Sequence, residues 1–116
     1  MVGQGDIHWL ELDEPRGSEP GYRHPCVIVQ NDAFNRSNIN TTVVCMLTSN
    51  VKFASSPGNV LLRKGDGNLS KASVVNVSQI TKINKSDLMQ KIGKLPKAKL
   101  EEIIDGIGRL LKPISI

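Results

Sequence analysis

Apolar and polar residues alternate along most of the chain, and this period of two predicts a mainly β fold. Runs rich in Val, Ile and Thr that are bounded by Gly, Pro, Asn and Asp are typical of strands. The expected strands cover residues 7–12, 26–30, 41–47, 60–62, 73–83 and 89–95. Single helical turns are expected at 33–37, capped by Asp32, and at 85–88.

The end of the chain has a helical period instead. Its apolar residues recur every three or four positions or lie side by side: Leu100, Ile103, Ile104, Ile107, Leu110 and Leu111. This spacing predicts the apolar face of a helix, with Pro96 near its start and Pro113 after its end. Gly106 and Gly108 weaken such a helix but let another surface approach it closely. Five to seven strands and one terminal helix predict a small, closed, mostly antiparallel barrel, a mainly β (α+β) fold.

Length and composition narrow the class of protein. The 116 residues suffice for one core, so we expect a single domain over residues 1–116. One Trp, one Tyr and two Phe leave little aromatic surface for stacking bases and imply an aliphatic core. Fifteen Lys and Arg against eleven Asp and Glu give a net charge of +4, which mildly favours an anionic partner.

The two cysteines lie in apolar, strand-like runs. Cys26 and Cys45 are interpreted as buried thiols, with a disulfide between neighbouring strands or a metal site with His8 and His24 as alternatives. The spacing of Cys and His residues matches no zinc motif, so no metal or other cofactor is expected. The first ten residues do not read as a signal peptide, and the longest apolar run, 43–47, is too short for a membrane span. We therefore expect a cytoplasmic protein without membrane contact.

A long polar segment separates the first two expected strands. Residues 13–24 contain two prolines and two glycines and predict a loop, and loops of this length in small domains are usually functional or mobile. The segment ends on Arg23 and His24, directly before Pro25, which we expect to open the second strand. An arginine and a histidine at the mouth of a buried strand are candidates for binding a phosphate.

Three blocks of the sequence, in register, resemble the MazF/PemK toxin family. They are Gly-Ser-Glu at 17–19, Val-Gln-Asn-Asp at 29–32 and Leu-Thr-Ser at 47–49, within a similarity that runs from Gly5 to about Leu111. The resemblance implies an SH3-like barrel with a C-terminal helix that forms a homodimer. It also implies a metal-independent endoribonuclease that cuts single-stranded RNA, such as mRNA, at short sequences, and a cognate antitoxin that neutralises it.

In such an enzyme the 2′-hydroxyl of the RNA attacks the adjacent phosphorus, giving a 2′,3′-cyclic phosphate and a 5′-hydroxyl. The family's catalytic threonine matches Thr48. Its catalytic arginine stands directly before the proline, where this chain has His24, and the arginine here is one place earlier, at Arg23. Either His24 or Arg23 then serves the phosphate. We favour shared duty, with His24 transferring protons and Arg23 supplying charge; an inactive variant is the remaining alternative.

The resemblance also implies RNA contacts around this pair. The expected RNA-binding residues are Glu19, Ser49, Lys71, Ser73 and Gln79. The alternative for each is that it is merely exposed on the surface and has no function. A second class of function is a non-enzymatic toxin like the gyrase-binding CcdB proteins, which share this kind of fold but need no catalytic groups. A titratable group at position 24 together with a hydroxyl at position 48 favours the enzyme.

Overall fold

The computed structural model describes residues 1–11 and 23–114. Six strands form one sheet: β1 (Asp6–Glu11), β2 (Arg23–Ile28), β3 (Thr41–Thr48), β4 (Val60–Leu62), β5 (Ser73–Asn84) and β6 (Leu88–Lys94). Two α-helices, α1 (Asp32–Asn35) and α2 (Lys97–Leu111), and three short 3-10 turns, at Val51–Ser55, Asp66–Asn68 and Lys85–Asp87, complete the described chain.

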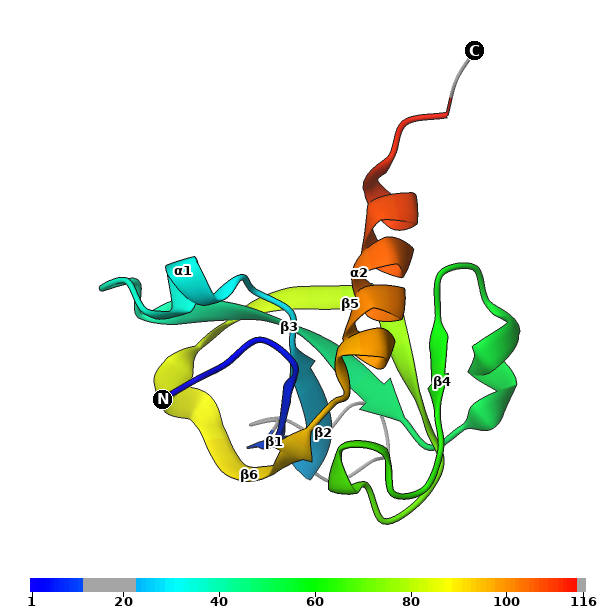
Figure 1. Ribbon diagram of the computed structural model, residues 1–116, viewed down its shortest axis with the longest axis horizontal. Helices are drawn as coiled ribbons and strands as arrows, with labels where there is room; N and C mark the ends of the chain where they lie inside the picture. The colour runs from blue at the N-terminus through cyan, green and yellow to red at the C-terminus, as the bar shows by residue number, and fades with distance from the viewer. Residues whose placement is uncertain (12–22, 115–116) are drawn as a thin grey trace.

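The sheet is antiparallel and curled. Its strand order is β4-β5-β3-β2-β1-β6, so that β4 and β6 form its edges (Figure 1). The long strand β5 turns through Lys85–Asp87 into β6, which returns beside β1 and curls the sheet into a half-barrel. The expected mainly β fold with a C-terminal helix is therefore confirmed, although among the described residues the edge strands β4 and β6 do not pair to close the sheet.

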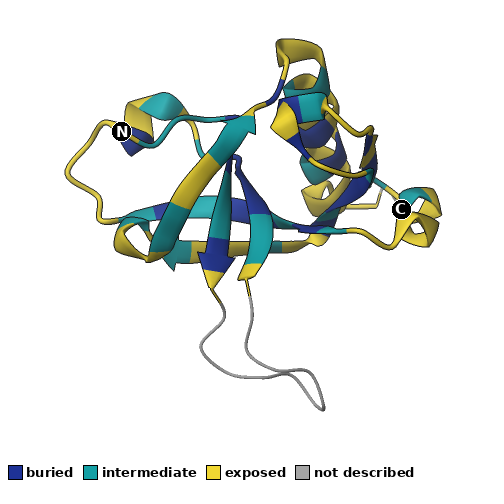
Figure 2. Ribbon diagram, turned by 90° about the horizontal axis from the view of Figure 1, so that it is seen from below, coloured by how far each residue is buried: buried dark blue, intermediate teal, exposed yellow. Residues whose placement is uncertain are grey.

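Side chains on the two faces of the sheet build two apolar clusters. On one face, Ile7, Val27, Cys45 and Val75 pack with Ile103 of α2, and all five are fully buried. The opposite face holds a smaller cluster: Leu10, Cys26, Ile28 and Val44. Neighbouring residues of a strand thus enter different clusters, as the pleat requires. Figure 2 shows the buried residues along the strands and on the side of α2 that faces the sheet.

A contact between two glycines sets how closely α2 approaches the rest of the fold. A Cβ at Gly106 would overlap the carbonyl oxygen of Gly58, which itself has a φ of +80°. At Gly108 a Cβ would meet no atom within 4 Å. The expectation that a small residue in this helix allows a close approach is therefore confirmed for Gly106 and does not hold for Gly108.

The second strand begins earlier than predicted. The sequence favoured a loop through His24 and a strand from 26 to 30, whereas β2 covers Arg23–Ile28 and the rest of the predicted loop lies largely outside the described residues. Arg23 and His24 pair with Glu11 and Leu10 of β1. Pro25 is tolerated inside the strand because β2 pairs with β3 only from Cys26 onward, so no ladder bond on that side needs its missing N–H.

The first helix also differs from its prediction. It spans Asp32–Asn35, and its cap is Asn31, whose Oδ1 accepts a hydrogen bond from the backbone N–H of Ala33 at 2.7 Å. Asp32 was the predicted cap, but its Oδ1 accepts from the N–H of Gln4 at 2.7 Å instead. This long-range bond is the main reason that the pKa of Asp32 is lowered.

The cysteines behave as the sequence predicted. Cys26 and Cys45 are free and buried, and burial raises the pKa of each thiol to about 12. They belong to different apolar clusters, on opposite faces of the sheet, so the alternative of a disulfide between them is not realised. In the described part of the chain, no helix has the length and apolar character needed to cross a membrane.

Candidate active site

A cleft of about 920 Å3 lies at the start of β2 and the end of β3, with β6 and the segment before β5 along its sides. It brings together six of the predicted site residues: Arg23, His24, Thr48, Ser49, Lys71 and Ser73. These residues come from strands and turns that are far apart in the sequence. The curled sheet is what gathers them in one place.

The two remaining predicted residues are not part of this cleft as described. Glu19 lies outside the described residues. Gln79 is exposed on β5, and it is not among the residues that line the cleft. Ser73, in contrast, lies at the cleft but is only 4% exposed, and its hydroxyl donates to the carbonyl oxygen of Lys71 at 3.2 Å. Its immediate role is to shape the turn that carries Lys71.

Arg23 is held by two partners that the sequence analysis did not single out. Its guanidinium carbon lies 5.4 Å from the centroid of the Trp9 ring, which is a cation–π contact. Its Nη2 donates a hydrogen bond to Oε1 of Gln90 at 3.3 Å. Trp9 and Gln90 also line the cleft. Nothing in the local pattern around Gln90 marks it, because its neighbours depend on how β6 pairs with β1.

Arg23 and His24 point to opposite faces of the sheet. Both lie in the regular part of β2, where successive side chains alternate. Arg23 shares a face with Trp9, because Arg23 pairs with Glu11 and Pro25 pairs with Trp9. His24 pairs with Leu10 and shares the other face with it. The two side chains therefore leave β2 on opposite faces, although both residues line the cleft.

Thr48 and His24 both line the cleft. Cys26 pairs with Met46 where β2 and β3 meet, and His24 and Thr48 each lie two residues beyond that pair, so the alternation of each strand directs them to the same side of the sheet as Cys26 and Met46. Oγ1 of Thr48 accepts a hydrogen bond from the backbone N–H of Asn50 at 3.2 Å. Since a hydroxyl both donates and accepts, this bond leaves its hydrogen able to donate to another group.

The charge of the cleft suits an anion. Its described lining includes the cationic residues Arg23, Lys71 and Lys91. The same described lining contains no Asp and no Glu. Lys91 is paired with the buried carboxylate of Asp6, at 3.3 Å between Nζ and Oδ1. Within the described residues, no three His, Cys, Asp or Glu side chains come together as a set of metal ligands.

The fold and the cleft define a small β protein with a cationic site for an anionic ligand. Residues 3–111 match the family described as the PemK-like, MazF-like toxins of type II toxin–antitoxin systems. The chain belongs to this family. The resemblance seen in the three sequence blocks is thereby confirmed.

Relatives and solved structures agree with this assignment. The endoribonuclease MazF6 of Mycobacterium tuberculosis is 36% identical over 111 residues, which cover 96% of this chain and 97% of the relative. The endoribonuclease MazF of Staphylococcus saprophyticus is 33% identical over 107 residues, covering 92% of this chain and 88% of that protein. A MazE–MazF structure from Deinococcus radiodurans superposes with a TM-score of 0.76 at 25% identity and covers 95% of each chain. A mycobacterial endoribonuclease in complex with its cognate antitoxin gives a TM-score of 0.79 at 22% identity and covers 99% of this chain and 100% of that one, which supports the fold.

Proposed function

We propose that this chain is the toxin of a type II toxin–antitoxin pair and an endoribonuclease that cuts single-stranded RNA at short sequences without a metal. Membership of the PemK-like, MazF-like family over residues 3–111 and the endoribonuclease names of its curated relatives support this function. The observation that carries it is the cationic cleft, which His24 and Thr48 line together.

The reaction requires three catalytic contributions: a base, a proton for the leaving oxygen, and stabilisation of charge on the phosphoryl oxygens. A base removes the proton of the 2′-hydroxyl, whose oxygen attacks phosphorus and forms the new P–O bond of the cyclic phosphate. The bond from phosphorus to the 5′-oxygen breaks, and this oxygen takes a proton from solvent water or from the protonated base and leaves as a 5′-hydroxyl. Hydrogen-bond donors or cations stabilise the charge on the two non-bridging oxygens while the bonds change.

His24 is suited to the role of the base, and Thr48 is suited to stabilising charge on the non-bridging oxygens. An imidazole ordinarily titrates near neutral pH, so His24 can exchange a proton with the RNA oxygens. The Thr48 hydroxyl keeps a hydrogen that can donate to a non-bridging oxygen. Arg23, on the other face of β2, adds positive charge to the cleft without sharing the contact at phosphorus. This division keeps the shared duty that the sequence favoured, with His24 for proton transfer and Arg23 for charge.

The other predicted residues have supporting parts in this proposal. Ser49 and Lys71, both exposed at the cleft, contact the RNA backbone on either side of the scissile bond. Glu19 stays a proposed contact, and Gln79 is reached only by an RNA that continues along β5. Contacts of Lys and Arg with phosphate make binding weaken as the salt concentration rises.

The test is cleavage of a long single-stranded RNA by the purified protein in EDTA. Fragments with 5′-hydroxyl ends are expected from the wild type and are expected to be lost in His24→Ala and in Thr48→Val. Thr81→Val is the matched control, because Thr81 is exposed on β5 outside the cleft. Equal activity in all three variants and the wild type would remove His24 and Thr48 from the mechanism.

One observation favours a second function. At the position of the family's catalytic arginine this chain has His24. A chain that has lost catalysis could carry this residue too, and so could a toxin that binds gyrase as CcdB proteins do. His24→Arg, which returns the family's residue, separates these cases. An inactive wild type together with an active His24→Arg variant would identify a lapsed nuclease. If both are inactive, inhibition of gyrase is the next assay.

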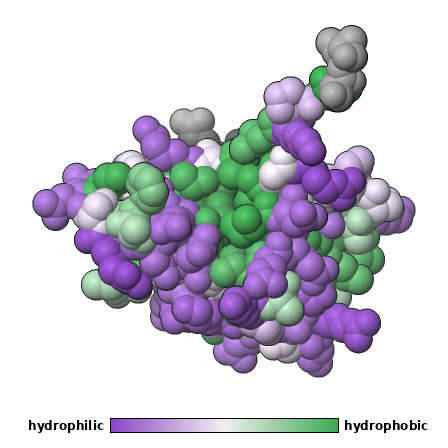
Figure 3. All heavy atoms as spheres, turned by 45° about the horizontal axis from the view of Figure 1, so that its top comes forward, coloured by the Kyte–Doolittle hydropathy of each residue, from purple (hydrophilic) through white to green (hydrophobic). Residues whose placement is uncertain are grey.

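The proposal includes partners and a location. We propose a homodimer, neutralised in the cytoplasm by a cognate antitoxin. Exposed apolar side chains on α2 are consistent with a contact surface, since Ile104 is 41% and Leu111 68% exposed. Figure 3 shows apolar side chains gathered beside α2 and over the neighbouring elements. Light scattering of the purified toxin, alone and with a co-expressed antitoxin, tests both assemblies.

A further inference from the structure

Strand β6 is irregular beside Trp9. His8 pairs with Lys91 and Leu10 pairs with Leu88, so one residue of β1 faces two residues of β6, Met89 and Gln90. This two-against-one count is a β-bulge, which bends a strand and redirects a side chain. Here the redirected side chain is Gln90, which reaches Arg23 on the Trp9 side of the sheet.

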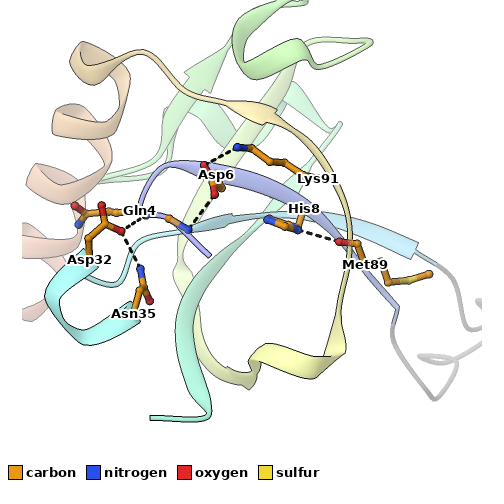
Figure 4. Close-up of polar contacts among 8 residues, drawn as sticks. Gln4, Asp6, His8, Asp32, Asn35, Met89 and Lys91 are labelled. Carbon is orange, nitrogen blue, oxygen red and sulfur yellow. Dashed lines mark hydrogen bonds and ion pairs between the residues drawn. The ribbon is translucent and has the colours of Figure 1, made fainter. Parts of the chain in front are cut away.

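Side chains of β1 pin the bulge on both sides of Gln90. Nδ1 of His8 lies 2.9 Å from the carbonyl oxygen of Met89, and because a carbonyl only accepts, Nδ1 carries the hydrogen. On the other side, the carboxylate of Asp6, which is only 3% exposed, pairs with Lys91. Figure 4 shows both contacts reaching from β1 to β6. Of the two neighbours of Gln90, Met89 is thus held at its backbone carbonyl and Lys91 through its side chain.

The amide of Gln90 is oriented by its partner. A guanidinium has only donors, so the amide atom that faces Arg23 is the oxygen Oε1. The amide nitrogen Nε2, with its two hydrogens, is then directed away from Arg23. Gln90 and Arg23 are both exposed, and the guanidinium carbon of Arg23 lies over the Trp9 ring.

We propose that Trp9, Arg23 and Gln90 form a subsite for one nucleobase of a single-stranded RNA. The base stacks on the outer face of the Arg23 guanidinium, and Nε2 of Gln90 donates to an acceptor on the edge of the base. Stacking on an arginine plane requires an unstacked base, which a duplex does not offer. This inference rests on the proposed function for its ligand, and it assigns Arg23 to binding.

The single tryptophan provides a direct binding assay. Because Trp9 is the only Trp in the chain, its fluorescence reports on this subsite. The probes are short single-stranded oligonucleotides with 2′-O-methyl groups, which have no attacking hydroxyl and stay uncut. We expect saturable quenching by the single-stranded oligonucleotide and about tenfold weaker binding of the same sequence as a duplex.

Gln90→Glu tests whether the side chain at position 90 selects the base through a hydrogen bond. A carboxylate accepts where the amide donated, so preference at one base position should shift by about tenfold toward bases that present a donor. The assay sequences the products from RNA with randomised sites and measures quenching by the uncut oligonucleotides. Asn84→Asp is the control, because it makes the same amide-to-carboxylate change at an exposed end of β5, where the side chain caps nothing. Circular dichroism confirms that both variants are folded.

The outcomes separate this subsite from the proposed activity. If the wild type cuts RNA but Gln90→Glu and Asn84→Asp have the same base preference and the same quenching, the subsite is wrong and the nuclease stands. If the wild type cuts nothing in EDTA while Gln90→Glu changes which oligonucleotides quench Trp9, the subsite stands without the nuclease. Absence of any quenching by single strands at saturating concentration overturns the subsite in either case.

Discussion

The guanidinium carbon of Arg23 lies 5.4 Å from the ring centroid of Trp9, while His24, the next residue, faces the other side of the sheet. The cause is the pleat of β2, which begins at Arg23 and alternates from there. An arginine and a histidine that are adjacent in the sequence therefore lie in different parts of one cleft. We assign the base-binding part to Arg23 and the reacting phosphate to His24.

This division predicts different kinetic effects at the two positions. Arg23→Lys keeps the charge but loses the planar group, so we expect KM to rise several-fold while kcat stays within about twofold. His24→Ala should lower kcat by about 100-fold or more, because it removes a proton-transfer group. Cleavage of one short RNA at varied concentration measures both constants. If Arg23→Lys lowered kcat as strongly as His24→Ala, Arg23 would belong at the phosphate.

A second prediction concerns His8, which holds the bulge of β6 through the carbonyl of Met89. In His8→Phe this carbonyl loses its partner and Gln90 is no longer aimed at the Trp9 face. We expect base preference at the Gln90 position to fall about tenfold, with the rate on saturating RNA nearly unchanged. Sequencing of the products measures the base preference. If His8 only stabilised the fold, His8→Phe would instead lower the stability and the cleavage rate and leave the base preference unchanged.

The glycines of α2 predict opposite effects of one substitution. Gly106→Ala forces a Cβ against the carbonyl of Gly58, so the free energy of unfolding should fall by about 2 kcal/mol. Gly108→Ala meets no atom of the described residues within 4 Å and should raise it by up to about 1 kcal/mol, because alanine is the better helix former. Urea unfolding followed by circular dichroism compares the two. Equal effects would mean that α2 does not rest on the Gly58 turn.

The buried thiols predict how stability depends on alkaline pH. Burial raises the pKa of Cys26 and Cys45 from an ordinary value near 9 to about 12. Unfolded chains lose these protons first, so their contribution to the free energy of unfolding is complete below pH 9 and is lost as pH rises toward 12. The double variant Cys26→Ala/Cys45→Ala should lose less stability between about pH 8 and pH 10.5 in urea unfolding. Parallel pH dependences of the two proteins would contradict this.

Much of the fold followed from local patterns, and the errors occurred where distant contacts decide. The predicted strand 41–47 and the predicted terminal helix closely match β3 and α2, because alternation and helical spacing are properties of a few neighbouring residues. The cap of α1 was misassigned, because Asp32 prefers the distant N–H of Gln4 to its own helix. The start of β2 was set too late, because pairing with β1 extends the strand through Arg23.

The site shows the same limit. The family blocks in the sequence pointed to His24 and Thr48, and both line the cleft. The sequence passed over Trp9 and Gln90 as cleft residues, because their meeting depends on a bulge between two strands about eighty residues apart in the chain. Local periodicity has no information on such a bulge.

By itself, then, the sequence determined the class of fold and the family, and it supplied the candidate residues for the chemistry. Hydrophobic spacing and motif blocks act over short stretches and can be read directly. Only the tertiary structure decided that Arg23 and His24 face opposite ways, and that Gln90 rather than Gln79 lines the cleft. The physical reason is that strand register fixes the direction of each side chain, and a shift of one residue reverses it.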